Sequence, residues 1–147
     1  MTKDVLISLC TVQSNPGETQ EDRTQTLISG NYYEKNDRHY ILYDEEMEGF
    51  SKAVKTKVKF NENMLEIIRN GPIGVRMLFE ENKKNVTSYN TPYGSIMLGI
   101  STKKINVIVL PDIIEVDVEY TLDADGGHLS DCSMNMKIQS KKSGAEA

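Results

Sequence analysis

The sequence predicts an all-β protein, an antiparallel up-and-down meander closed into a barrel, with a two-sheet sandwich as the alternative. Three observations indicate this class. Apolar and polar residues alternate with a period of two over residues 113–123, which places one face of an extended strand in the interior. Short turn signals separate the other apolar segments, so successive strands are antiparallel neighbours. No segment has a convincing helical period, and closure removes the edges of so long a sheet.

Composition favours a single domain with one solvated sheet face. The chain has 147 residues, 38% of them hydrophobic and 27% charged, which is typical of a sheet buried on one side only. The net charge of −5 argues against a nucleic-acid partner, which requires clustered Lys and Arg. We expect residues 1–140 to form one barrel domain and residues 141–147 to be a disordered tail.

About nine to eleven short strands are expected from the alternation and the turn signals. Gly30 indicates a bulge or bend within the second strand, and Lys103 with Lys104 is expected to reverse the chain. Residues 64–69 also fit one helical turn, but the flanking turns favour a strand. We expect residues 86–91 to pair back onto residues 75–80. The expected strands are residues 5–10, 24–34, 39–43, 53–60, 64–69, 75–80, 86–91, 96–100, 105–110, 113–123 and 131–138.

The cysteines and acidic turns predict neither a metal site nor a cofactor. Cys10 and Cys132 lie far apart and have no ligand spacing, so both are expected to be small buried residues. Residues 123–127 resemble a calcium loop but lack its required ligands, which indicates a hairpin turn. No signal peptide or membrane span is evident, so we expect a cytoplasmic protein.

Two charged residues lie at strand positions that point to the same face as apolar residues expected to be buried. Arg69 shares a strand face with Leu65 and Ile67, and Glu45 shares one with Tyr43. If both point into the barrel they must pair, because an isolated buried charge costs several kcal/mol. The alternatives are a structural ion pair that fixes the register, or two charges in water near strand ends.

Other polar side chains have a parity that places them near this pair. Together they would form a polar floor that orients an anionic or amphipathic ligand inside an otherwise apolar barrel. Tyr120 is the one residue on the apolar face of its strand with a polar tip, so its phenol needs a partner. The candidate binding residues are Arg69, Glu45, Tyr43, Tyr89, Thr91 and Tyr120.

A series of short motifs, in order along nearly the whole chain, resembles the small calycin-like, lipocalin-like β-barrel proteins of bacteria. That family is a domain of unknown function. The resemblance implies a closed antiparallel barrel of about 8–10 strands, related in shape to lipocalins and fatty-acid-binding proteins, and implies no activity. The chain departs from the family pattern around residues 72–74. The motifs include residues 43–46, 59–60, 65–71, 77–80, 89–94, 118–122 and 135–138.

We therefore expect a non-enzymatic barrel that binds a small hydrophobic or amphipathic molecule, with Arg69 as the anchoring cation. The alternative is a protein-interaction or structural barrel whose interior is filled by side chains. An enzyme is a distant third, because no catalytic motif is present and the acidic Glu45, Glu46 and Glu48 are typical of solvated surface. No nucleic acid, membrane, metal or cofactor is expected, and the oligomeric state stays open.

Overall fold

A computed structural model describes residues 1–15, 17, 19–45, 54–70, 74–91, 94–125 and 127–141, without the side chains of residues 45, 89–91, 128 and 129. These residues form ten strands and, within the described part, no helix. The strands are β1 (Asp4–Ser14), β2 (Asp22–Lys35), β3 (Arg38–Glu45), β4 (Val54–Phe60), β5 (Met64–Asn70), β6 (Val75–Glu80), β7 (Lys83–Thr91), β8 (Gly94–Val109), β9 (Ile113–Ala124) and β10 (Gly127–Ser140).

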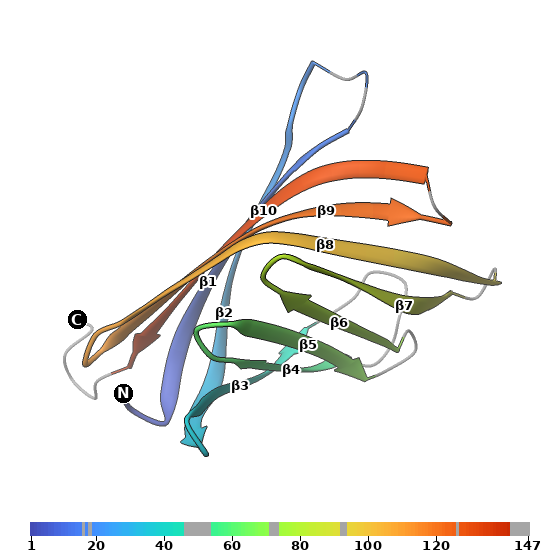
Figure 1. The fold of residues 1–147 in the computed structure, drawn as a ribbon. Helices are drawn as coiled ribbons and strands as arrows, with labels where there is room; N and C mark the ends of the chain where they lie inside the picture. Colours follow the sequence, from blue (N-terminus) through green and yellow to red (C-terminus); the bar gives the residue numbers. More distant parts are fainter. Residues whose placement is uncertain are drawn as a thin grey trace.

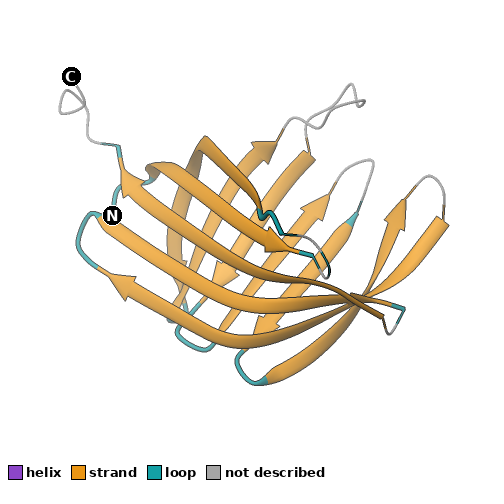
Figure 2. Ribbon diagram, turned by 90° about the horizontal axis from the view of Figure 1, so that it is seen from above, coloured by secondary structure: helices purple, strands orange, loops and turns teal. Residues whose placement is uncertain are grey.

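All ten strands belong to one antiparallel sheet, which curls into a nearly closed barrel (Figures 1 and 2). Its order is β6-β5-β4-β3-β2-β1-β10-β9-β8-β7, so the first and last strands of the chain pair with each other and the meander otherwise follows the sequence. The predicted all-β, up-and-down barrel is therefore confirmed. Residues 64–69 form strand β5, as the flanking turns indicate.

The two ends of the sheet, β6 and β7, are consecutive along the chain and lie side by side (Figure 1). The expected pairing of residues 86–91 with residues 75–80 is wrong, because β7 pairs with β8 instead. Within the described residues, no backbone ladder joins β6 to β7. A side-chain bond crosses this seam, from Asn85 Nδ2 to the Leu78 carbonyl at 3.3 Å.

The expected chain reversal at Lys103 and Lys104 is also wrong. Both residues lie within β8, which runs without a turn beside β9. The pairing register shifts between Thr102 and Lys104, so one extra residue forms a bulge instead of a loop. The turn before β7 supports this bulge: Asn82 N donates to Thr102 O at 2.9 Å, and Ile105 N donates to Glu81 Oε2 at 3.0 Å.

Alternate residues of the strands fill the interior. Residues 113–123 lie in β9, where Ile114, Val116 and Val118 are fully buried between β8 and β10. Of the tail expected to be disordered, only Lys141 is described, and its N donates to Asp4 O at 3.0 Å; residues 142–147 lie outside the described part. The largest fully buried side chains are those of Phe60, Phe79, Ile7, Ile41, Leu65, Ile100, Ile114, Met136 and Ile138.

Gly30 lies where β2 leaves β1 and turns toward β3. Backbone pairing with β1 runs to Asn31, and pairing with β3 begins at the same residue. A Cβ on Gly30 would lie 2.7 Å from the Leu42 carbonyl oxygen and 2.9 Å from Ile7 Cδ1. The register of β2 and β1 does not shift at Gly30, so the β-bulge considered for this position is absent. Glycine is needed here because only it allows the backbone of β3 to approach this closely.

Candidate functional site

The inward-facing side chains become less buried toward one end of the barrel. On β9, Val118 is fully buried whereas Leu122 is partly exposed. On β8, Ile100 is fully buried whereas Ile96 is 39% exposed, and on β1 burial falls from Ile7 to Gln13. We call the end that holds Gln13, Ile96 and Leu122 the open end. The opposite part of the interior is packed by apolar side chains.

One wall of the barrel carries inward polar side chains near the open end. The register sets Arg69 of β5 opposite Thr56 of β4, and Thr56 opposite Tyr43 of β3. Thr56 and Tyr43 are buried, and Arg69 is half-buried. Because paired residues of antiparallel strands point to the same face, the three form a row across this wall.

A second polar row crosses the facing strands. Thr102 of β8 pairs with Tyr120 of β9, Tyr120 with Cys132 of β10, and Cys132 with Gln13 of β1. Gln13 Nε2 donates to Ser130 Oγ at 3.0 Å, and that hydroxyl lies 3.5 Å from Cys132 Sγ. The two rows together form the polar layer, which consists of Tyr43, Thr56, Arg69, Thr102, Tyr120, Cys132, Ser130 and Gln13.

Thr102 differs from its neighbours in the polar layer. Its side chain is 3% exposed, and the buried Oγ1 has no hydrogen-bond partner among the described residues. A buried hydroxyl without a partner costs about 1–3 kcal/mol, so such groups usually mark a place for water or another molecule.

The charge of Arg69 in the first row affects the Tyr120 phenol in the second row. Burial raises the pKa of Tyr120, the neighbouring Cys132 thiol raises it further, and the Arg69 guanidinium lowers it. Arg69 therefore lies close enough to act on the Tyr120 phenol from the other wall. Phe79 packs edge-on against the Tyr120 ring, with 4.8 Å between centroids.

The Cys132 thiol is not set up as a nucleophile. Burial raises its pKa, although its hydrogen bonds with Ser130 and Tyr120 lower it. Nucleophilic cysteines instead have a lowered pKa, so that the thiolate is present at neutral pH. In the polar layer the thiol acts as a weak hydrogen-bonding group.

Three of the six predicted binding residues lie together in the polar layer: Tyr43, Arg69 and Tyr120. Only the backbone is described for the other three. Glu45 pairs with Val54, Tyr89 with Ile96 and Thr91 with Gly94, while their side chains, and the acidic residues 46 and 48, lie outside the described part.

Sequence reasoning missed several members of the layer. Thr56 alternates with Val54 and Val58, so its inward direction was readable from the sequence. Thr102 has the same parity as Ile96, Leu98 and Ile100, but the expected chain reversal at Lys103 and Lys104 placed it beyond the end of its strand. Ser130 and Gln13 gave no signal, because both residue types are common on wet strand faces.

The described residues contain no group of three His, Cys, Asp or Glu side chains that could hold a metal ion. Nor is there, in the same part of the chain, a helix long and apolar enough to cross a membrane.

Fold and site together define a class: an antiparallel β-barrel with a packed apolar interior and a buried polar layer near one end. Residues 7–136 match one family over most of the chain, and the chain belongs to that family, the domain of unknown function DUF1934.

Two similarities to known proteins agree with this assignment. The chain is 30% identical over 90 residues to the uncharacterized beta-barrel protein YwiB of Bacillus subtilis (strain 168); the alignment covers 58% of this chain and 62% of that protein. In fold it is similar to the crystal structure of the B. subtilis ywiB protein, with a TM-score of 0.81 and 23% identity over 95% of this chain and 93% of the other.

Proposed function

We propose that the protein is a non-enzymatic barrel that binds a small hydrophobic or amphipathic molecule at the open end of its interior. The observation that carries this proposal is the buried Thr102 hydroxyl, which has no partner among the described residues and belongs to the same layer as the Arg69 charge. A ligand with an anionic or polar head would supply that partner.

The environment of the polar layer suggests an orientation for this ligand. Its head would lie between Arg69 and Tyr120, the two groups that interact across the barrel. Its apolar part would contact the partly exposed Leu122, Leu98 and Ile96 toward the open end, where apolar area is still accessible.

A cytoplasmic location is part of the proposal. Cys10 and Cys132 are both free thiols. They lie on opposite faces of the sheet, because Cys10 pairs with Asn135 whereas the neighbouring Cys132 pairs with Gln13. Thiols that cannot pair within the chain are typical of a reducing compartment.

The test is binding of dodecanoate and of uncharged 1-dodecanol, measured by displacement of a fluorescent naphthalene sulfonate. Arg69→Leu is expected to weaken dodecanoate binding about tenfold or more, the usual effect of losing a charge-assisted contact. It should leave 1-dodecanol binding unchanged. Thr102→Val, which keeps the shape but removes the hydroxyl, should weaken both.

Arg38→Leu is the matched control, because Arg38 is exposed at the β2–β3 turn. It should bind both compounds like the wild type, and circular dichroism should show all variants folded. If wild type and Arg69→Leu bind dodecanoate with equal affinity, Arg69 does not anchor the ligand.

A second candidate is an interaction or structural barrel that takes no ligand. It is favoured by the packing of the interior, where Phe60, Phe79 and Leu65 are fully buried in one continuous cluster. If the wild type binds neither dodecanoate nor 1-dodecanol, this second candidate replaces the first.

A further inference from the structure

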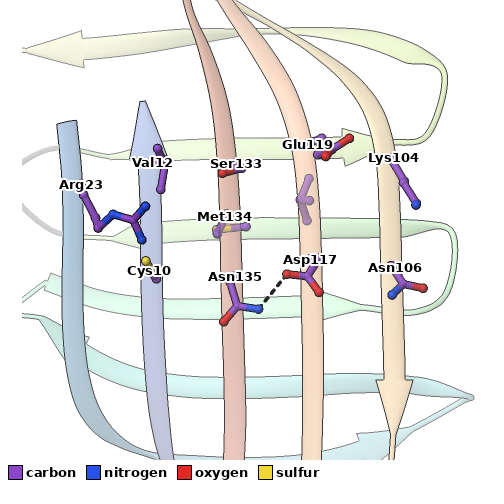
Figure 3. Close-up of a pocket in the computed structure, with 11 residues that line it drawn as sticks. Cys10, Val12, Arg23, Lys104, Asn106, Asp117, Glu119, Ser133, Met134 and Asn135 are labelled. Carbon is purple, nitrogen blue, oxygen red and sulfur yellow. Dashed lines mark hydrogen bonds between the residues drawn. The ribbon is translucent and has the colours of Figure 1, made fainter. Parts of the chain in front are cut away.

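A polar groove crosses the outer face of β2, β1, β10, β9 and β8 (Figure 3). Its volume is about 410 Å³. On β9 and β10, Asp117, Glu119, Ser133 and Asn135 alternate with the buried core residues, so they point away from the interior. The groove is therefore separated by the sheet itself from the polar layer inside the barrel.

The groove is built from two rows of paired residues. In one, Arg23 lies opposite Val12, and the row continues through Ser133 and Glu119 to Lys104. In the other, Cys10 is followed by Asn135, Asp117 and Asn106. Paired residues share a face, so each row presents its side chains along one line across the strands.

Most charged side chains of this groove form no ion pair or hydrogen bond with other described residues. Asn135 Nδ2 donates to Asp117 Oδ1 at 2.7 Å, the bond drawn in Figure 3. Within the described part of the chain, the side chains of Arg23, Lys104 and Glu119 form neither an ion pair nor a hydrogen bond. A guanidinium on β2 and carboxylates on β9 thus face the groove without neutralising each other.

We propose that this groove binds a short zwitterionic peptide, with the α-carboxylate at Arg23 and the α-ammonium at Glu119 and Asp117. The guanidinium fork matches a carboxylate, and carboxylates accept from an ammonium group. Asn106 and Ser133 offer hydrogen bonds to the peptide groups between these ends.

The distance between Arg23 and the carboxylates of β9 determines which peptide length fits the groove. Three strand spacings separate β2 from β9, which is about 14 Å. The Arg23 side chain reaches over β1 toward the other strands and shortens this span (Figure 3). An extended tripeptide is about 10 Å long, so it can join the two charges, whereas a single amino acid cannot. Val12 and Cys10 lie on β1 beside Arg23, and their small size leaves room for small peptide side chains (Figure 3).

The experiment uses trialanine, its C-terminal amide and its N-acetyl derivative, titrated into isotope-labelled protein and followed by amide chemical shifts. Trialanine is expected to shift resonances of β1, β9 and β10 around the groove. Arg23→Gln and Glu119→Gln should each weaken its binding about tenfold or more, the usual effect of losing a charge-assisted contact. The amide should bind the wild type and Arg23→Gln equally, and the N-acetyl derivative should bind the wild type and Glu119→Gln equally.

Glu115→Gln is the matched control, because Glu115 lies on the same face of β9 but outside the groove. It should bind trialanine like the wild type. The proposal is overturned if trialanine and its blocked derivatives bind equally, if the shifts lie away from the groove, or if no shifts appear. None of these outcomes depends on the dodecanoate result, because the two sites lie on opposite faces of the sheet.

Discussion

At the scale of single residues, buried polar side chains distinguish this barrel from a purely apolar one. Tyr120 occupies an inward position on β9 that an apolar residue would fill at lower desolvation cost. Its phenol interacts with Cys132 and with Arg69, so burial of the hydroxyl is compensated by the polar layer. The inward parity of Arg69 was readable from the sequence, whereas Thr102 was expected beside a turn until the register of β8 and β9 showed a continuous strand.

The raised pKa of Tyr120 makes stability depend on alkaline pH. The folded state holds the phenol proton above its ordinary pKa of 10.0, while the unfolded state releases it. Stability from this group is fully present below pH 10.0 and is lost as pH rises beyond it. Cys132 adds a similar loss from its ordinary value of 9.0 upward.

We therefore expect the free energy of unfolding in urea to decline from about pH 9 to pH 11. Tyr120→Phe should be less stable at neutral pH, because its bond to Cys132 is lost, but should decline less steeply above pH 10.0. The same slope in both proteins would show that Tyr120 titrates normally in the folded state.

At the scale of elements, β8 is one long strand that pairs with β7 on one side and β9 on the other. It bulges at Lys103, receives the β6–β7 turn at that bulge, and pairs with β7 and β9 on its two sides. Two adjacent lysines looked like a turn in sequence because they interrupt the apolar alternation. A β-bulge interrupts the apolar alternation in the same way as a turn. Only the pairing of β8 with β9 shows that Lys103 lies in a bulge and not in a turn.

The lysine row of β4 is solvated only in part. Lys55 is exposed, but Lys59 lies 3.7 Å from the buried Glu66 carboxylate, and Lys57 lies over the Tyr40 ring at 5.6 Å. Glu66 is also paired with Arg76 at 2.5 Å. Two of the three lysines, Lys57 and Lys59, therefore have partners on the outer face of the barrel wall.

Gly99 offers a test of packing across β8. Lys84 of β7 reaches Asp123 of β9 at 3.0 Å, and the Asp123 carboxylate lies over Gly99. A Cβ there would be 2.5 Å from Asp123 Oδ1, so Gly99→Ala should displace the carboxylate and break the ion pair. We expect a loss of about 1 kcal/mol in urea unfolding, since exposed pairs contribute about 0.2–1 kcal/mol.

Gly74→Ala is the control, because its Cβ would meet only the Arg69 carbonyl oxygen at 3.9 Å. In an Asp123→Ala background, Gly99→Ala should cost nothing further. A full cost in that background would assign the effect to the backbone of β8 instead of the ion pair.

At the scale of the whole molecule, the barrel is weakest in the middle of the sequence. β9 and β10 pair along twelve positions and β1 and β10 along ten, whereas the seam between β6 and β7 has no backbone ladder in the described residues. Local opening should therefore begin at this seam, because fewer backbone hydrogen bonds have to break there.

Native-state hydrogen exchange tests this order. Amides of β9, which is paired on both sides, should exchange most slowly, and those of β6 and β7 faster. Asn85→Ala, which removes the bond to the Leu78 carbonyl, should accelerate exchange in β6 and β7 but not in β9. Equal acceleration in all three strands would mean that the barrel opens only as a whole.

The sequence by itself determined most of the strands, the antiparallel up-and-down meander, and the parity that Arg69 shares with Leu65 and Ile67 and Tyr120 with Val116 and Val118. These properties follow from alternation and short turns, which are local. Only the tertiary structure decided that β8 is continuous, that β6 and β7 meet at a seam, and that the charge of Arg69 acts on the Tyr120 phenol, which pairs with Thr102 and its unpartnered hydroxyl. Register and closure depend on residues far apart in the chain, and no local pattern encodes which of them come together.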